Sequence, residues 1–140
     1  MRVALRGIAG VLIGLIVAFV LVVALELFSA VVHPVPEGFT GTMEEMCRLV
    51  ENYPQWILAV AVAAWAVTAL LSTWVAKKIG NLYSALIVGL LLLAALVMNL
   101  SMLPYPIWFK VANLIAIPGA IAAGLQLSRR QKIAAKAEAA

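Results

Sequence analysis

The residue whose chemistry stands out is Glu26, a lone carboxylate in the otherwise uncharged apolar stretch 7–32. Placing a charge inside the hydrocarbon of a bilayer costs a few kcal/mol, so this side chain should face protein or water and serve some purpose. Ser29 and His33 follow at i+3 and i+7 and therefore share a helix face with Glu26. An acid, a hydroxyl and an imidazole on one face are a set of groups that can exchange protons.

Two amides are predicted to lie at the same depth as the carboxylate. Counted from the outer ends of their helices, Glu26, Asn99 and Asn113 lie roughly 6 to 10 Å inside at 1.5 Å per residue. In one interpretation, this polar layer is a titratable pocket that opens outward. Desolvation there favours the protonated form of Glu26, and His33 passes protons between Glu26 and water. In the other, Glu26 only ties its helix to Asn99 or Asn113 by a hydrogen bond.

The elements that must position these groups are membrane helices. The chain has 140 residues, of which 66% are hydrophobic and 11% charged, a composition far from that of soluble globular domains. Crossing about 30 Å of hydrocarbon takes roughly 20 residues, and four apolar stretches are long enough. We predict an all-α, polytopic membrane protein with a single domain over 1–140, whose helices span about 8–32, 55–76, 82–103 and 107–127. An external loop, 33–54, and a cytoplasmic tail, 128–140, complete it.

The basic residues set the expected orientation. Eight lysines and arginines fall on the side of the two termini, while Arg48 and Lys110 fall on the other. Basic residues favour the cytoplasmic side, so both termini are predicted to be cytoplasmic in a multi-pass protein of a bacterial inner membrane. The sequence pI near 9.6 therefore reflects topology, and we expect the lipid bilayer as a partner and no nucleic acid.

The external loop is predicted to carry a short amphipathic helix over 43–52. Thr42 and Glu45 have the spacing of a capping box. Apolar side chains then recur at i, i+3, i+4 and i+7, which places them on one face of a helix lying on the outer membrane surface. These side chains are Met43, Met46, Cys47 and Val50.

Small residues predict where the helices approach closely. Gly10 and Gly14 have the Gly-x-x-x-Gly spacing that brings two helix backbones together, and Gly7 extends this stripe. Ala85 and Gly89 are the corresponding small residues of the third long helix. The glycine stripe and Glu26 point about 120° apart at 100° per residue, so the first helix should be contacted on two sides.

Soft ligand atoms gather on the external side. Thioether, thiolate and imidazole groups suit Cu(I), and Met43, Met46, Cys47 and His33 could supply them. The methionines and the cysteine equally form the apolar face of the surface helix, so we assign no metal. A single His33 cannot provide both axial ligands of a haem within one chain, and no cofactor is expected.

No catalytic motif is present: the sequence has no Ser-His-Asp set, CxxC pair, HExxH or glycine-rich phosphate loop. We therefore expect no enzyme and assign no catalytic residue.

Several segments resemble small bacterial four-helix inner-membrane proteins that carry no assigned function. They are Glu26, His33-Pro34-x-Pro36-x-Gly38, the run 85–89, and Leu103-Pro104-Tyr105-Pro106-x-Trp108-Phe109. The resemblance implies four helices in a bacterial inner membrane and no activity. The small multidrug resistance family also has four helices and a first-helix glutamate, but the long external segment and the position of Glu26 near the outer end separate this chain from it.

Three functions follow as alternatives. The first is a small scaffold or accessory subunit that packs against a larger membrane complex or a second copy of itself. The second is a homo-oligomeric carrier of small solutes, or a proton-coupled carrier, that uses Glu26. The third is a periplasm-facing copper or redox accessory protein.

Overall fold

The computed structural model describes residues 2–138, with side chains described for residues 4–127. Within this part of the chain there are five helices and no strand: α1 (Arg2–Val32), α2 (Met43–Glu51), α3 (Gln55–Ile79), α4 (Leu82–Met102) and α5 (Ile107–Glu138). All but α2 are long and apolar enough to cross a membrane. The predicted fold class, an all-α multi-pass membrane protein with four spanning helices and a short helix in the first long loop, is confirmed.

Two of the helices extend well beyond their predicted bounds. α1 begins at Arg2, ahead of the span predicted from residue 8, and α5 continues past the span predicted to end at residue 127, through the tail segment to Glu138. The tail side chains and residues 139–140 lie outside the described residues. The apolar pattern marks only the segment that crosses the bilayer, whereas good helix formers such as alanine, lysine and glutamine let a helix run on past it.

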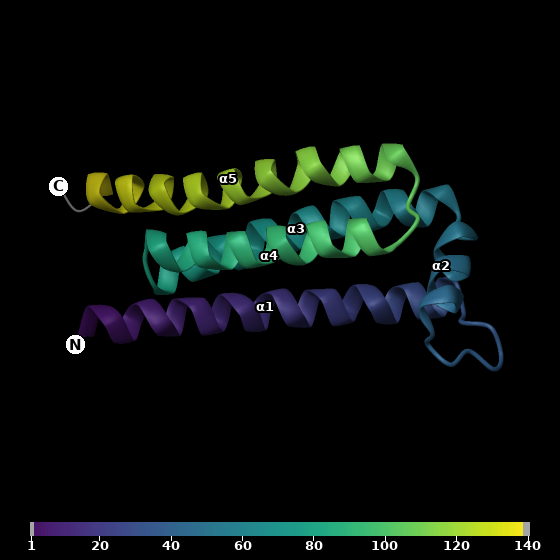
Figure 1. The fold of residues 1–140 in the computed structure, drawn as a ribbon. Coiled ribbons are helices and arrows are strands. Elements are labelled where there is room, and N and C mark those ends of the chain that lie inside the picture. The colour runs from purple at the N-terminus through teal and green to yellow at the C-terminus, as the bar shows by residue number, and fades with distance from the viewer. Residues whose placement is uncertain (1, 139–140) are drawn as a thin grey trace.

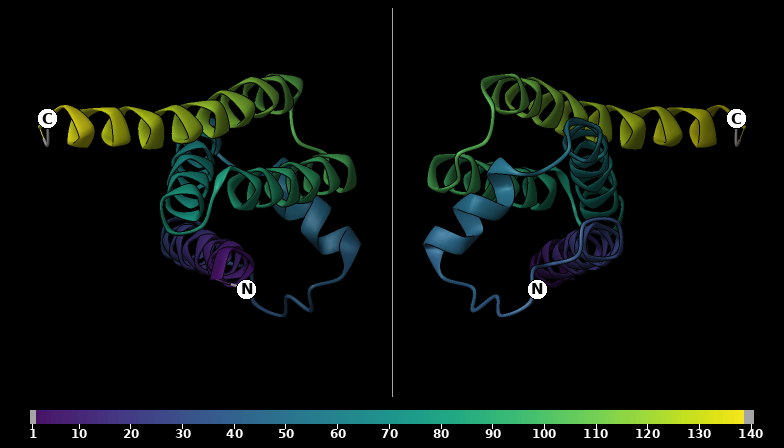
Figure 2. Two further views of the ribbon diagram at one scale, coloured as in Figure 1. Left: turned by 90° about the vertical axis from the view of Figure 1, so that its left-hand side faces the viewer. Right: turned by 90° about the vertical axis from the view of Figure 1, so that its right-hand side faces the viewer.

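The four long helices lie side by side, and α2 crosses the end of the bundle opposite both termini (Figure 1). We call these the α2 end and the terminal end. α3 is the central helix, between α1 and α5, and it also packs against α4 (Figure 2). Small buried residues on α3 allow this close packing, because short side chains let neighbouring helices approach. They are Thr68, Ala69, Ser72, Thr73 and Ala76.

The glycine stripe of α1 packs against the chain itself. A Cβ atom on Gly10 would lie 2.6 Å from the Cα atom of Gly80, and one on Gly14 would lie 2.8 Å from the Cβ atom of Ala76. Only glycine leaves room for these contacts. Gly7, Gly10 and Gly14 therefore fix α1 onto the α3–α4 hairpin instead of presenting a face to an outside partner.

The small residues predicted on α4 also lie in helix contacts. Ala85 is fully buried, and a Cβ atom on Gly89 would lie 3.1 Å from Ile121 of α5. The hairpin between α3 and α4 is closed by a capping box in which Asn81 accepts a hydrogen bond of 3.0 Å from the backbone of Ser84.

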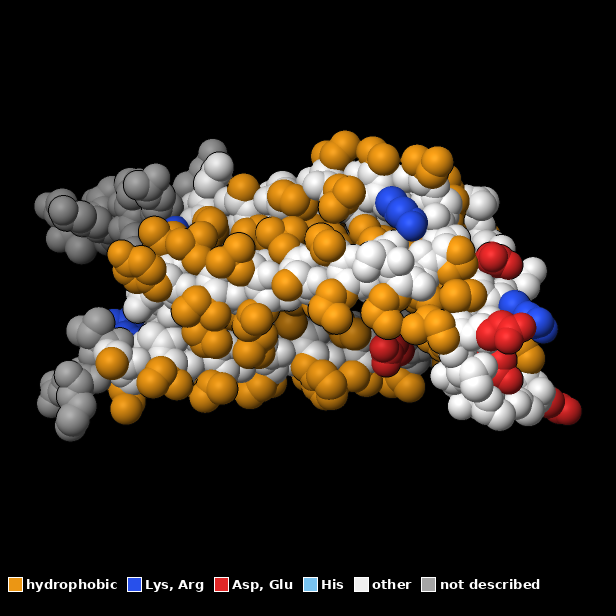
Figure 3. Space-filling model, in the orientation of Figure 1, with side chains coloured by type: hydrophobic (Ala, Val, Ile, Leu, Met, Phe, Trp, Pro, Cys, Tyr) orange, Lys and Arg blue, Asp and Glu red, His pale blue; other side chains and the backbone are white. Residues whose placement is uncertain are grey.

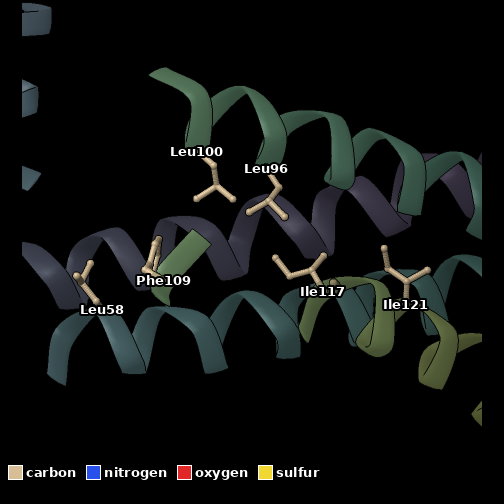
Figure 4. Packing of buried hydrophobic residues seen from close by; sticks show 7 residues of the cluster. Leu58, Leu96, Leu100, Phe109, Ile117 and Ile121 are labelled. Atoms are coloured by element: carbon tan, nitrogen blue, oxygen red, sulfur yellow. The ribbon is translucent and has the colours of Figure 1, made fainter. Parts of the chain in front are cut away.

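A larger hydrophobic core fills the bundle between α3, α4 and α5. Figure 4 shows its labelled side chains converging from these helices: Leu58, Leu96, Leu100, Phe109, Ile117 and Ile121. Phe109 is 1% exposed, and its ring lies 5.8 Å from Trp65 and 4.6 Å from Tyr105 between ring centres. Burying large aromatic rings in this way holds the helices in one arrangement.

Pro118 lies inside α5. Proline has no backbone N–H, so the carbonyl of Leu114 loses its hydrogen bond within the helix. α5 changes direction along its length in Figure 2, between its green first half and its yellow second half.

Basic side chains fasten the terminal end. Arg6 donates a hydrogen bond of 3.0 Å to the carbonyl of Ile79, and Lys77 donates one to the carbonyl of Leu125. The Lys78 ammonium lies 4.9 Å from the centre of the Trp74 ring, a cation–π geometry. Charged heads are thereby held at this end of the bundle by two backbone carbonyls and an aromatic ring.

Candidate functional site

A cavity of about 520 Å³ lies at the α2 end of the bundle. Its walls come from α1, α2, α3 and α4, together with residues before and within the first half of α5. Cavities of roughly 300 to 1,000 Å³ that are mainly apolar and carry a few polar groups are typical of small-molecule sites. The cavity is therefore the candidate functional site.

The cavity exists because α1 and α4 separate along their length. At the terminal end, the Ser84 hydroxyl donates a hydrogen bond of 2.9 Å to the carbonyl of Gly7, and Gly14 lies against Val88. Toward the α2 end, Leu25 of α1 and Ala95 of α4 face the same cavity instead of each other. The two helices thus meet near the termini and leave a space between them at α2.

Four of the five residues predicted to form a polar layer line this cavity: Glu26, Ser29, His33 and Asn99. Asn113 does not. It is fully buried within the bundle, where its amide nitrogen donates a hydrogen bond of 2.9 Å to the carbonyl of Phe109. Depth along a helix places a residue near a layer, but the rotation of α5 turns Asn113 away from the cavity.

Glu26 is exposed at the edge of the cavity. Within the part of the chain whose side chains are described, the ion pair found is Glu44 with Arg48, at 2.6 Å in α2, so Glu26 has no such partner there. Figure 3 shows an acidic side chain interrupting the hydrophobic surface over the part of α1 toward the α2 end. The carboxylate therefore stands at the boundary between the cavity and the surroundings of the bundle.

Tyr53 joins the polar groups of α1 to the start of α3. Its hydroxyl shares a hydrogen bond of 3.0 Å with Ser29, and its ring lies 4.9 Å from the ring of His33. Tyr53 is half-buried, and Ser29 provides a partner for its hydroxyl. From the sequence, Tyr53 reads only as an aromatic residue at a membrane interface.

Tyr105 is a second tyrosine in the cavity wall, and sequence reasoning missed its role. Burial, and to a smaller extent the nearby Tyr53, raise the pKa of Tyr105 to about 12 against the lowering effect of a hydrogen bond from Asn99. Both tyrosines directly precede a proline in a loop on the same side of the bundle. That shared placement is the signal by which the pair could have been found.

Asn99 leaves an acceptor unused. Its side-chain oxygen is buried and has no hydrogen-bond partner among the described residues, although Asn99 lines the cavity. A buried amide oxygen without a partner costs roughly 1 to 3 kcal/mol. A molecule in the cavity that donates a hydrogen bond to this oxygen would remove that cost.

Comparisons with known proteins give no relative. No protein-family model, curated protein or solved structure matches this chain. The function of the site is therefore argued from its own geometry and chemistry.

The candidate copper ligands are divided between the cavity and the surface. His33 and Met46 line the cavity, Cys47 is half-buried, and Met43 is 51% exposed. No group of three or more His, Cys, Asp or Glu side chains that could hold a metal ion occurs among the described residues.

The arrangement is suited to holding an amphipathic molecule. Apolar side chains make up most of the wall, among them Leu92 and Leu96, and they offer contact to a hydrocarbon group. Apart from Thr68 in the middle of α3, the polar groups lie in the last two turns of α1, the last turn of α4 and the loops that follow them. A ligand with an apolar body and one polar end matches this division.

Proposed function

We propose that this protein binds a small amphipathic ligand in the cavity at the α2 end and acts as a carrier for it. The observation that carries the proposal is the cavity of about 520 Å³, with Glu26, Ser29, His33 and Asn99 in its wall. A scaffold needs neither a cavity of this size nor a carboxylate at its edge. The proposed role of this protein is to bind and move a ligand, without catalysis.

We place the protein in a bacterial inner membrane with both termini in the cytoplasm and the cavity toward the outside. The count of basic residues on the side of the termini supports this orientation. The α2 helix supports it as well, because a short amphipathic helix with charged residues on one face is suited to a membrane surface. The cavity then lies in the half of the bilayer that faces the exterior.

Glu26 is the group through which ligand binding would be coupled to protons. An ionisable side chain within a membrane-spanning helix is costly and commonly marks a substrate or proton pathway, and a carboxylate can bind either a ligand or a proton. A homo-oligomer, in which two or more copies alternate between access to the two sides, is the form in which a chain of this size would work as a carrier.

The proposal is tested by tryptophan quenching, because Trp65 lines the cavity. The protein in lipid nanodiscs is titrated with dodecyl maltoside carrying bromine on its alkyl chain, and the Trp65 signal is obtained by subtracting a Trp65→Phe variant. We expect saturable quenching, and we expect Ala95→Phe to abolish it by filling the cavity. Ala94→Phe is the matched control, since Ala94 is the exposed neighbour of Ala95 on α4 and does not line the cavity.

Quenching that rises linearly with probe concentration, and that is the same in Ala94→Phe and Ala95→Phe, would mean that the probe only partitions into lipid. That result would overturn the proposed binding site.

An accessory subunit is the second candidate, and α2 is the feature that favours it. Glu44 and Arg48 project from α2 with side chains 76% and 73% exposed, so this face is available to a partner protein. Native mass spectrometry of the protein extracted gently from its source membrane distinguishes the two functions. A stable complex with other subunits supports the accessory role, whereas masses at multiples of 14.9 kDa support a self-contained carrier.

A further inference from the structure

We propose that the ligand of this cavity is a cationic amphiphile, a molecule with an alkyl chain and an ammonium group, which reaches its site sideways from the bilayer between α1 and α4. This inference rests on the proposed function and adds the charge of the ligand and its route. It is carried by the charges, the hydrogen-bonding groups and the exposed edge of the cavity.

The charges in the cavity wall have one sign. Among the described residues that line the cavity, Glu26 is the one carboxylate and none is lysine or arginine. The other titratable side chains in the wall are His33, Tyr53 and Tyr105. Arg48 adjoins the wall residue Leu49 in sequence, but it lines a second hollow beside α2 and is paired with Glu44. An anionic ligand would therefore find a negative charge and no positive partner.

The hydrogen-bonding groups favour a donor in the ligand. The hydroxyl of Thr68 already donates to the carbonyl of Ala64 at 2.8 Å, and Ser29 and Tyr53 bond to each other. The side-chain oxygen of Asn99, by contrast, is a buried acceptor without a partner. The hydroxyl of Thr68 and one hydroxyl of the Ser29–Tyr53 pair are thus engaged as donors, while a buried acceptor and a carboxylate remain for a cation.

Aromatic rings line the same region. Trp65, Tyr53, Tyr105 and Phe109 all belong to the wall of the cavity. The faces of such rings attract ammonium groups, most strongly when water is excluded. A quaternary ammonium, which has no N–H to donate, could still be held by these rings and by the charge of Glu26.

The exposed edge of the cavity gives the route. Glu26, Phe28 and Ala30 of α1 and Ala95 of α4 line the cavity and are exposed on the surface of the bundle. α1 and α4 pack together toward the terminal end, as at Ser84 and Gly7, and both line the cavity toward the α2 end. An amphiphile lying in the bilayer can therefore move its alkyl chain between these helices, and its charged end passes Glu26.

Competition among three amphiphiles with the same alkyl chain tests the inference. Dodecyltrimethylammonium, dodecanol and dodecyl sulfate, each below its micellar concentration, compete with the brominated maltoside for quenching of Trp65 at pH 7.5. Empty nanodiscs and the Ala95→Phe variant correct for partition into lipid. We expect the ammonium compound to compete at least tenfold more strongly than the other two.

Glu26→Gln is expected to reduce that preference to within about twofold, because it removes the charge and keeps the shape of the side chain. Ala94→Phe should keep the full preference. If Glu26→Gln does not fold, the competition of the three compounds on the wild-type protein still tests whether the ligand is cationic.

Equal competition by the three compounds, or stronger competition by dodecyl sulfate, would overturn the cationic ligand while leaving the binding cavity intact. An unchanged preference in folded Glu26→Gln would overturn the role of Glu26. Absence of saturable quenching by the maltoside itself would overturn the proposed function together with this inference.

Discussion

Single side chains, or their absence, decide how closely the helices of this bundle approach. Gly10 illustrates this, because its Cα hydrogen stands where any Cβ atom would meet the backbone of Gly80 and Ala76. Backbone atoms cannot move aside as the tip of a flexible side chain can. One methyl group at this position must therefore push α1 away from the α3–α4 hairpin.

We predict that Gly10→Ala lowers the free energy of unfolding by about 1 to 3 kcal/mol, the usual cost of overpacking. The measurement is unfolding in mixed micelles, followed by far-UV circular dichroism. Gly119→Ala is the control, since nothing lies within 4 Å of a Cβ atom there. Alanine should leave stability unchanged or raise it by about 0.5 to 1 kcal/mol, because glycine is the poorer helix former. Equal losses in both variants would contradict the tight contact at Gly10.

Tyr105 gives a second prediction at the scale of the residue. Its pKa is raised to about 12, mainly by burial and then by Tyr53, against an ordinary value of 10.0. Since the folded-state pKa lies above the unfolded value, the contribution of Tyr105 to stability is complete below pH 10 and is lost as the pH rises through about 12. Ultraviolet titration of tyrosinate should show one late-titrating group that is missing in Tyr105→Phe. A curve unchanged by that substitution would show that Tyr105 is not the late group.

At the scale of the element, α2 is held by local hydrogen bonds at its start. The Glu45 carboxylate accepts hydrogen bonds from the backbone and the hydroxyl of Thr40, at 2.9 and 2.8 Å, and one of 3.3 Å from the backbone of Thr42. Gly38 and Gly41 precede the helix with positive φ angles of 81° and 79°, which glycine adopts without strain. The element that covers the cavity therefore depends on a short turn sequence and its charge.

Hydrogen bonds from Thr40 hold the pKa of Glu45 below its ordinary value of 4.5. A lowered folded-state pKa means that the stabilisation is present above pH 4.5 and is lost as the pH falls through the folded value. We predict that α2 loses protection from amide hydrogen exchange in this acid range. Glu45→Gln should show weaker protection that no longer varies with pH over the same range. If both proteins respond to acid alike, another group controls α2.

At the scale of the whole molecule, the two ends of the bundle differ in charge and in packing. The terminal end is closed by the contacts of Arg6 and Lys77, whereas the α2 end contains the cavity. A carrier needs such an asymmetry, because a ligand must reach the site from one side while the other side is sealed. In the proposed orientation, with α2 outside, the open side faces the exterior and the sealed side faces the cytoplasm.

Cysteine labelling in intact cells tests the orientation, because Cys47 is the one cysteine of the chain and lies in α2. We predict that a membrane-impermeant maleimide labels Cys47 without cell lysis. In a Cys47→Ser background, Lys78→Cys, in an exposed position at the terminal end, should be labelled only after lysis. The reverse pattern would invert the orientation and place the cavity toward the cytoplasm.

The amino-acid sequence by itself determined the four spanning helices and the capping box of α2. Long apolar runs and the Thr42–Glu45 spacing are local features, so they act whatever the rest of the chain does. The sequence also indicated that Glu26, Ser29 and His33 share a face, since a helix of fixed period places them there.

Only the tertiary structure decided which residues meet across helices. The rotation of each helix about its axis depends on the close contacts at Gly10, Gly14 and Gly89, which no local pattern specifies. That rotation places Asn99 in the cavity and Asn113 in the packed interior. It also turns the glycine stripe inward and brings Tyr53 and Tyr105 together, because contacts distant in sequence, and not helix periodicity, set how α1, α3, α4 and α5 face one another.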